Sequence, residues 1–543
     1  MPSFTANPNP HAMAEEVKAT PLHIEAITDN DNPKSMPTQE VEQTVWEEIK
    51  SSPRVIAYTA LANAGSIVFG FDILVTGAVT ALPAFSGVDD FSMTYGEPYQ
   101  GQLILPALWQ GLWTAFIQLG IMIGAAGSAA FQDRFGRRMA FILGGVVSAV
   151  GSALAYASPE TVIDLTGRRT LFLFAKLVTD AGIGVLMTTC QTYVSEISPV
   201  KIRGALLAVF PFAASVGQLI AITLVFSRIM IMDVSSFRIP FAAQWAFSAL
   251  AIISGLVLPE SPSFFMARNN PTAARKAYLR LYGSTADADL ALSKVQAVLD
   301  HEKEQQASIG SASFAKCFKG TARRRSLIII LLALLQYFLG VSLLANANYF
   351  LIMAGMSPTQ SLQISQIGVG VQMACICIAG VTMTYFGRRF IVLCSCAATG
   401  VVFIGQGAAG FFQHDANALT FIGVSILLVG ATSALGVGAT WPVLIGELSS
   451  VRLRAKSSAI GFMTNALAGV AFSISVPYMF NEDAGDLGGK IGFIFAFFCF
   501  LGLVLSWLYL PETKAKSYEE LDYLFERKVP ARKFKKAVYG EYN

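Results

Sequence analysis

The sequence predicts an all-α membrane protein whose twelve transmembrane helices form two six-helix halves. Three observations lead to this prediction. The 543 residues are 54% hydrophobic and 14% charged, with a mean hydropathy of +0.53, which excludes an ordinary soluble domain. Apolar runs of about 20 residues, the length that crosses a bilayer core as a helix, recur along the chain. Several short motifs occur twice at one spacing, which indicates an internal repeat.

The apolar runs give the twelve spans. They do not have the short alternating pattern of a transmembrane β-strand, so the predicted class is α-helical. The predicted spans are residues 55–82, 109–131, 139–157, 170–193, 204–227, 240–258, 326–353, 363–385, 389–411, 418–446, 457–478 and 489–510.

The basic residues set the orientation of these spans. They fill the connections after spans 2, 4, 8 and 10, whereas the connection 83–108 contains three acidic residues and no basic one. Because basic connections stay in the cytoplasm, both termini are expected there. The first 54 residues are polar and contain no signal-peptide core, so span 1 must itself direct the chain to a membrane, which we expect to be the plasma membrane.

The repeated motifs divide the chain into two halves. Each half has an even number of spans, so the halves are expected to be parallel repeats about an axis along the membrane normal. The motifs that recur at an offset of 251 or 252 residues are Glu196–Gly204 with Glu447–Ala455, Phe135–Arg138 with Phe386–Arg389, and Pro259–Ser261 with Pro511–Thr513.

These landmarks set the predicted domain boundaries. The linker between the halves contains two stretches with helical periodicity, Pro271–Tyr282 and 287–299, which are expected along the cytoplasmic surface. The predicted divisions are a disordered cytoplasmic tail (1–50), an N-terminal half (51–259), a cytoplasmic helical linker (260–325), a C-terminal half (326–512) and a cytoplasmic C-terminal tail (513–543).

In the interiors of the predicted spans, away from their ends, only three residues are charged: Asp72, Lys176 and Asp180. A charge in hydrocarbon is unfavourable by a few kcal/mol or more, so these groups should face a cavity and have partners. Asp72 and Lys176 are each about 17 residues from the inner end of their span, roughly 25 Å from the cytoplasmic face, and can meet. Pairing alters the proton affinity of a carboxylate, as a proton-coupling site requires. Alternatively, Lys176 and Asp180 neutralise each other at i, i+4 and Asp72 is structural.

The chain also resembles a known family in its motifs. Over about residues 50–535 it resembles the major facilitator superfamily and, within it, the sugar-porter family. The motifs that carry this resemblance are Asp133–Arg138 between spans 2 and 3, Pro259–Pro262 after span 6, Pro511–Lys514 after span 12, Gly70–Asp72 in span 1 and Gly217–Leu219 in span 5. Finer matches resemble the fungal α-glucoside:proton symporters: Trp109-Gln110, Tyr349-Phe350, Arg238–Trp245 and Leu521–Phe534.

This resemblance implies a sugar site between the halves. A sugar is recognised through side-chain amides and aromatic rings in a partly apolar cleft. The residues implied are Gln218, Gln336, Asn346, Asn348, Tyr349, Trp441 and Asn465. For the three asparagines and the tryptophan, hydrogen bonding or packing between helices is an equal alternative.

The resemblance also implies a conformational latch on the cytoplasmic side, made by ion pairs and helix-dipole contacts between the halves. The alternative is that the basic residues act only as a topology signal. Thr384 and Tyr385 replace the acidic and basic residues of the second copy, which predicts a degraded latch there. The implied residues are Asp133, Arg134, Gly136, Arg137, Arg138, Glu196, Arg203, Gly387, Arg388, Arg389, Glu447 and Arg454.

Three departures from the family pattern stand out. Lys176 occupies the place of an arginine, span 7 keeps only the first glutamine of its motif, and Asp180 stands where relatives have glycine. Lysine is a point charge without the bidentate fork of arginine, so this replacement is not neutral.

The sequence therefore predicts a secondary active transporter that imports a sugar, such as the α-glucoside maltose, by proton symport through alternating access. Its expected partners are the sugar, protons and the lipid bilayer, and it is expected to work as a monomer without cofactor, metal or nucleic acid. No catalytic constellation indicates an enzyme. The alternatives are a hexose or polyol uniporter without proton coupling and a transporter-like sugar sensor.

Overall fold

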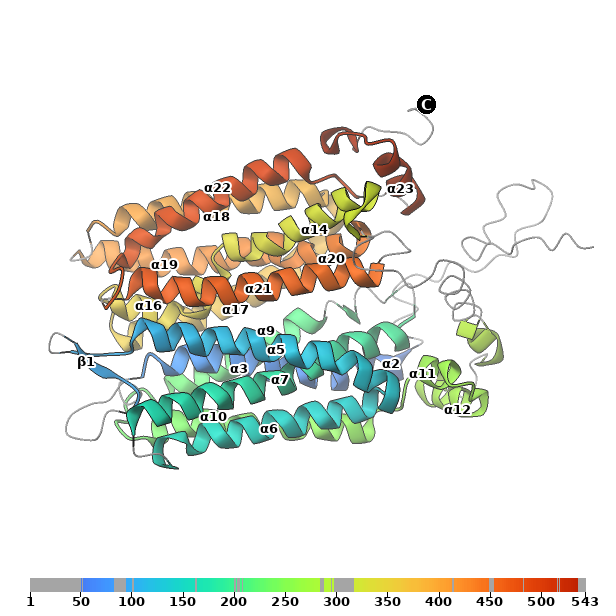
Figure 1. The fold of residues 1–543 in the computed structure, drawn as a ribbon, viewed down its shortest axis with the longest axis horizontal. Coiled ribbons are helices and arrows are strands. Elements are labelled where there is room, and N and C mark those ends of the chain that lie inside the picture. The colour runs from blue at the N-terminus through green and yellow to red at the C-terminus, as the bar shows by residue number, and fades with distance from the viewer. Residues whose placement is uncertain are drawn as a thin grey trace, which may run out of the picture.

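The structure is a computed structural model in which two helical bundles lie side by side, with the N-terminal half below and the C-terminal half above in Figure 1. A β-hairpin lies at one end of the long axis, and the linker helices lie at the other. The described residues are 50, 52–82, 94–99, 102–161, 164–199, 202, 206–207, 209–283, 288–293, 295–296, 317–412, 415–448, 454–481, 483–514, 516 and 518–535.

The N-terminal half contains the first six spans, and the first of them is divided at Asn63. The long helices are apolar on most faces, as expected where helices contact both lipid and protein. The helices are α2 (Pro53–Ala62), α3 (Ala64–Val79), α5 (Ala107–Phe135), α6 (Arg137–Thr161), α7 (Leu165–Ile197), α9 (Val209–Phe226) and α10 (Ser235–Val257).

The C-terminal half contains the other six spans, two of which are irregular. Span 7 is divided at Gly340, which has a φ of 80°, and again at Asn346. A π-helical turn, η2, interrupts span 10 at Gly436. The elements are α14 (Gly320–Phe338), α15 (Val341–Ala345), α16 (Ala347–Met353), α17 (Pro358–Tyr385), α18 (Arg388–Ala409), α19 (Ala416–Ser433), η2 (Ala434–Gly438), α20 (Ala439–Leu448), α21 (Arg454–Phe480), η4 (Gly488–Lys490) and α22 (Ile491–Tyr509).

All twelve predicted spans coincide with helices. Eleven helices in the described part of the chain are long and apolar enough to cross a membrane. Span 7 is not among them because α14 begins with three arginines and ends at Phe338, where the span is divided. Together α14, α15 and α16 cover the predicted range 326–353.

The connection between spans 1 and 2 contains a hairpin that the sequence did not predict. β1 (Glu97–Tyr99) pairs with β2 (Gln102–Ile104) in antiparallel register, with Tyr99 opposite Gln102. Arg169, only 2% exposed, holds the hairpin: its Nε donates to the Tyr95 carbonyl at 2.8 Å and its Nη1 pairs with Glu97. Arg169 lies one residue before predicted span 4, so the search of the span interiors missed this buried charge.

Two of the glycine motifs bring helices α3 and α9 into backbone contact. A Cβ on Gly70 would lie 1.8 Å from the Ala214 carbonyl oxygen, and one on Gly217 would lie 2.2 Å from the Ile67 carbonyl oxygen. Glycine allows this approach because it has no side chain. The contact fixes how α3 is rotated, and so where Asp72 points.

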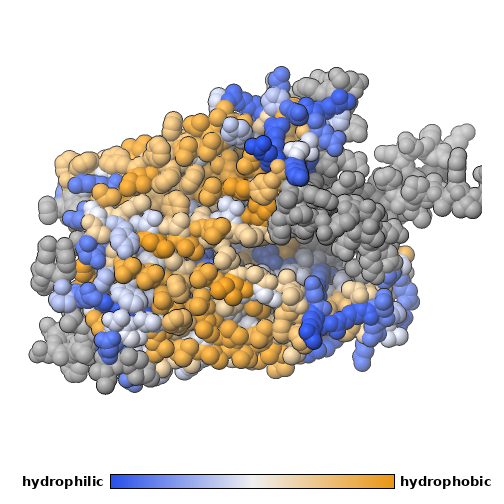
Figure 2. Space-filling model, in the orientation of Figure 1, coloured by the Kyte–Doolittle hydropathy of each residue, from blue (hydrophilic) through white to orange (hydrophobic). Residues whose placement is uncertain are grey.

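Hydrogen bonds between the halves gather at their outer ends, near the hairpin. The Leu105 amide donates to the Tyr349 hydroxyl at 3.0 Å, and the Asn481 amide donates to the Leu105 carbonyl at 2.8 Å. The Ala107 amide donates to the Asp483 carboxylate at 3.0 Å. Figure 2 shows the surface hollowed between the halves toward the opposite end, which carries the linker helices. The molecule is therefore closed at its outer end.

The linker and the C-terminal segment both contain short helices. α12 (Pro271–Tyr282) matches the first predicted linker helix and follows α11 (Pro262–Ala267). In the second predicted stretch, 287–299, the described residues 288–293 and 295–296 are helical. In the predicted C-terminal tail, α23 (Tyr518–Glu526) and η5 (Ala531–Lys533) pack on the C-terminal half, where the Arg324 guanidinium donates to the Val529 carbonyl at 2.7 Å. Of the predicted N-terminal tail only Lys50 is described.

Candidate transport site

The three predicted charges meet inside the N-terminal half. The Lys176 ammonium lies 2.5 Å from Asp72 Oδ2 and 3.5 Å from Asp180 Oδ2. Asp72 is 3% exposed, and Lys176 and Asp180 are each 1% exposed. The two alternative pairings therefore both occur, with the shorter contact to Asp72. One cation shared by two carboxylates leaves one negative charge in excess if both are ionised.

Glycines in α5 and α6 allow these helices to pack closely against α7, and this close packing buries the charged triad (Asp72, Lys176 and Asp180). A Cβ on Gly120 of α5 would lie 2.9 Å from the Asp180 Cβ, and one on Gly151 of α6 would lie 2.3 Å from the Thr179 amide nitrogen. Neighbouring backbones thus cover α7 on two sides. The Lys176 side chain cannot extend to water as it does at helix ends, so its charge has to be balanced by the two carboxylates.

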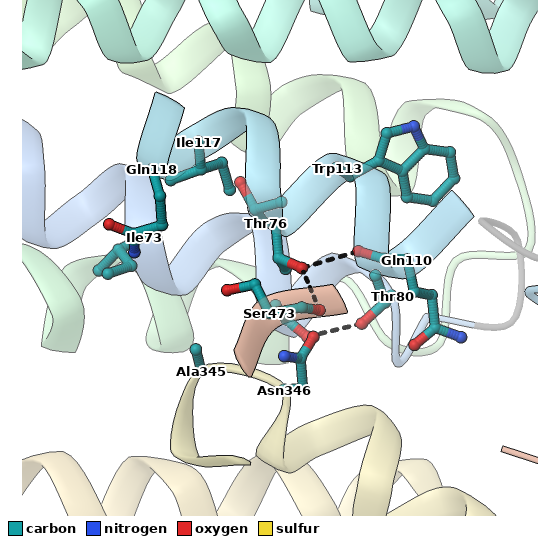
Figure 3. Close-up of a pocket in the computed structure, with 12 residues that line it drawn as sticks. Ile73, Thr76, Thr80, Gln110, Trp113, Ile117, Gln118, Ala345, Asn346 and Ser473 are labelled. Carbon is teal, nitrogen blue, oxygen red and sulfur yellow. Dashed lines mark hydrogen bonds between the residues drawn. The ribbon is translucent and has the colours of Figure 1, made fainter. Parts of the chain in front are cut away.

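A second feature is an uncharged pocket between the halves, with a cavity volume of about 30 Å³. α3, α5, the α15–α16 junction and α21 line it, and Figure 3 shows their side chains around the space. Its polar lining consists of hydroxyls and amides: Thr76, Thr80, Gln110, Thr114, Gln118, Asn346 and Ser473. Such groups can donate to and accept from sugar hydroxyls, and Trp113 and two isoleucines supply apolar surface.

The pocket touches both the triad helix and the interface between the halves. The Thr76 hydroxyl, one turn from Asp72 in α3, donates to the Asp72 carbonyl at 3.0 Å. A Cβ on Gly77 would lie 2.2 Å from the Ala345 carbonyl oxygen, so α3 and span 7 are in contact at this wall. The Thr114 hydroxyl donates across the interface to the Ser473 carbonyl at 3.1 Å. A movement of one half against the other would change this pocket.

The predicted sugar residues do not gather in one place. Asn346 lines the pocket. Asn348 accepts hydrogen bonds from Ser361 and Ser365, and the Tyr349 hydroxyl accepts from Leu105, so both hold the fold together.

The four other predicted sugar residues lie elsewhere. The Asn465 amide donates to the Ala333 carbonyl at 3.2 Å, and Trp441 stacks edge-on against Phe462. Gln218 and Gln336 each have one buried amide atom without a partner in the described part of the chain, so their ligand role stays a prediction. The polar pocket residues other than Asn346 were missed; Thr76 and Thr80, spaced four residues apart after Asp72, were the signal that could have found them.

The predicted latch residues form a repeated structure at the start of α6 and α18, at the end of the molecule that carries the linker helices. In the N-terminal half the Glu260 carboxylate accepts from the amides of Arg137 and Arg138 at 3.0 and 3.1 Å, and Arg137 Nη2 lies 2.7 Å from Glu196 Oε1. We call this set of contacts the N-terminal bracket. It satisfies two free amides of the helix start and places a negative charge at the positive end of the helix dipole.

The C-terminal bracket repeats these contacts. Glu512 accepts from the amides of Arg388 and Arg389 at 2.9 and 3.2 Å, and Arg388 Nη2 lies 2.9 Å from Glu447 Oε1. The C-terminal half therefore has the same ion pair and helix cap as the N-terminal half. The degradation that Thr384 and Tyr385 indicate for this copy of the latch stays a prediction.

The described contacts of both brackets lie within a half. A latch between the halves stays a prediction, because this conformation is hollowed between the halves at the end that carries the linker helices. Gly136 and Gly387 leave the space that the two carboxylates fill, since a Cβ would lie 2.4 Å from Glu260 Oε2 and 2.1 Å from Glu512 Oε2 respectively.

Four further latch residues stand outside the brackets. Asp133 is exposed, and the Arg134 carbonyl accepts from Arg268. Arg203 and the Arg454 side chain lie outside the described residues.

Comparison with known families identifies this architecture. The profile of the family described as "Sugar (and other) transporter" matches residues 58–525. The chain belongs to this family. The structure is similar to the partially occluded inward-open XylE xylose transporter of E. coli, with a TM-score of 0.70, 22% identity and coverage of 86% of this chain and 100% of that one.

Two curated relatives match along nearly the whole chain. The "MFS transporter fmqE" of Aspergillus fumigatus is 29% identical over 509 residues, 92% of each chain. The "General alpha-glucoside permease" of Saccharomyces cerevisiae is 26% identical over 544 residues, 98% of this chain and 85% of the relative. These findings confirm the predicted fold and class: a multi-pass transporter of the major facilitator superfamily and its sugar-porter family, which is not an enzyme.

Proposed function

We propose that this protein imports a sugar by proton symport across the plasma membrane, with an α-glucoside such as maltose as substrate and both termini in the cytoplasm. One observation carries the proposal: the buried charged triad lies one helical turn from an uncharged pocket of hydroxyls and amides. The 26% identity to a yeast protein named as an α-glucoside permease supports the substrate class.

The triad supplies the proton chemistry. With both carboxylates ionised, the group carries a net negative charge in a region of low dielectric constant, where an uncompensated charge is strongly unfavourable. Uptake of one proton by Asp72 or Asp180 neutralises the group. Coupling follows if the transporter changes conformation readily only in the neutral state, because each cycle then carries a proton.

Helix α3 links the proton to the sugar. Asp72 lines the cavity beside the triad, and Thr76 and Thr80, one and two turns further along the same helix, line the pocket. A sugar bound between the halves would contact α3 and the α15–α16 junction together. It would thereby favour the closure of the halves, which also encloses the triad.

Uptake by reconstituted protein tests the proposal. Labelled maltose should accumulate in vesicles that have an inward proton gradient, and an uncoupler should abolish the accumulation. Asp72→Asn should remove accumulation but keep exchange of labelled for unlabelled sugar, because the pocket is unchanged. Asp289→Asn is the control, since this exposed aspartate pairs only with Arg275 on the linker surface. Accumulation by Asp72→Asn at the wild-type level would contradict proton coupling through this residue and favour a uniporter.

The substrate needs a separate test because the fmqE relative is named without any substrate. Competition of unlabelled mono- and disaccharides against labelled maltose should rank the α-linked disaccharides first. Stronger competition by hexoses or polyols would contradict the α-glucoside assignment and leave the transport function intact.

A further inference from the structure

A second cavity lies behind Asp72, entirely within the N-terminal half. α3, α6, α7 and α10 form its walls around a cavity volume of about 10 Å³. Its polar lining is Asp72, Ser152, Lys176, Thr179 and Gln244. It shares no lining residue with the uncharged pocket, and α3 contributes to the walls of both. The triad therefore borders a space of its own, apart from the interface between the halves.

Gln244 is the residue in this cavity that the transport site leaves unexplained. It is 2% exposed, and neither its Nε2 nor its Oε1 has a hydrogen-bond partner among the described residues. Asp180 Oδ2 also lacks a hydrogen bond there, although it lies 3.5 Å from the Lys176 ammonium. Buried amides are nearly always hydrogen-bonded, to protein or to ordered water. A donor and an acceptor left open beside two carboxylates point to an occupant that can both accept and donate.

Water is the occupant that fits this lining. A cavity of about 10 Å³ is about the smallest that holds one water molecule, which needs roughly two to four polar partners, and the lining of this cavity offers such partners. A metal cation fits poorly, because the Lys176 ammonium already lies between the two carboxylates and would repel it.

We propose that water in this cavity connects Gln244 to the triad and that Gln244 positions it for proton exchange with Asp72. The inference rests on the proposed proton symport. An incoming proton binds the water oxygen, and the water passes one of its own protons to a carboxylate oxygen of Asp72. The water is regenerated and the carboxylate becomes a carboxylic acid; release is the reverse. Protons and sugar thus use separate compartments, one inside the N-terminal half and one between the halves.

The surrounding helices bring few other charges to Asp72. Besides Lys176 and Asp180 from α7, α10 contributes Arg238, which pairs with Glu160 at the outer surface. α9 and α15 contain no ionisable side chain, and the Tyr349 hydroxyl of α16 is bonded to Leu105. The protonation of Asp72 is therefore governed by the triad and by what the cavity holds.

Gln244→Met tests the inference, since methionine has a similar length and removes both polar atoms. The control is Gln406→Met in α18, a glutamine that is 0% exposed, has an unpartnered Nε2 and lies in the other half. In reconstituted vesicles Gln244→Met should lower proton-driven maltose accumulation by about tenfold, the scale of one hydrogen bond to a charged group. Its exchange of labelled for unlabelled maltose should stay within about twofold of wild type, and Gln406→Met should accumulate maltose normally.

The outcomes separate the two proposals. If wild type itself accumulates no maltose with protons, the proton symport fails. If wild type accumulates it and Gln244→Met does so equally with an unchanged pH profile, the cavity inference is overturned. Equal loss of accumulation and exchange overturns it too, because that pattern indicates a structural role. If Gln244→Met does not fold, Gln244→Glu provides the test. This variant places a carboxylate beside the water, so it should shift the pH profile of maltose accumulation. An unshifted profile overturns the inference.

Discussion

The two halves of the molecule have the same bracket at a helix start, but they differ in the charged triad. Both start their third helix with the same bracket, Glu260 in one half and Glu512 in the other, over a glycine that leaves space for the carboxylate. Among the described residues, a buried charged triad occurs in the N-terminal half and has no counterpart in the C-terminal half. The repeat offset of 251 residues places Leu427 and Ala431 where Lys176 and Asp180 stand. The duplicated fold thus keeps the contacts that start its helices, whereas the triad lies in one half.

The largest expected loss of transport and stability comes from disrupting the charged triad, which the halves do not share. Lys176→Met leaves two carboxylates buried without a cation, and removing one partner of a buried ion pair typically costs about 3–5 kcal/mol. We expect loss of transport and a lower melting temperature in detergent. Leu427→Met, at the repeated position, should leave both nearly unchanged. Wild-type melting of Lys176→Met would contradict the burial of charge argued here.

An intermediate loss of stability is expected from disrupting the bracket, which both halves have. Glu260→Gln and Glu512→Gln each replace a charged hydrogen-bond acceptor at a helix start, and each should lower the free energy of unfolding by about 1–3 kcal/mol. Melting temperatures of the two variants should fall by similar amounts. A large fall for one variant and none for the other would show that the two brackets are not equivalent.

The smallest effect on stability is expected at the outer interface, where the halves meet. Asp483→Ala removes the hydrogen bonds that the Ala107 amide and Asn481 donate to this carboxylate, each worth about 1 kcal/mol at a partly exposed site. The outer end should then open more often. In a variant without native cysteines, a cysteine at Thr80 should react faster with an impermeant thiol reagent when Asp483 is also replaced. An unchanged rate would exclude this contact from the closure of the outer end.

The transmembrane spans and the charged triad could be predicted from the sequence because their signals are local. Apolar length gave the twelve spans, and Asp72, Lys176 and Asp180 stood out as the charges inside them. The divisions at Asn63, Gly340 and Gly436 were not predictable, because a single polar residue or glycine in an apolar run does not reveal whether the helix continues.

The sugar site and the second cavity were harder to predict from the sequence. Asn348 and Asn465 look like sugar ligands in sequence, yet they bond to neighbouring helices. Gln244 appeared only as part of a family motif before span 6, and its role depends on burial beside α3 and α7. Which face a polar side chain presents is decided by tertiary packing, so single-sequence reasoning could find the charges but not their surroundings.

Proton movement during sugar entry tests the central claim most directly. Vesicles containing the reconstituted protein and an internal pH indicator are given maltose at equal pH inside and outside. The triad can be neutralised by a single proton, so maltose entry should acidify the interior by about one proton per sugar, and Asp72→Asn should stop the acidification. Maltose entry without any change in internal pH would contradict proton symport through the triad.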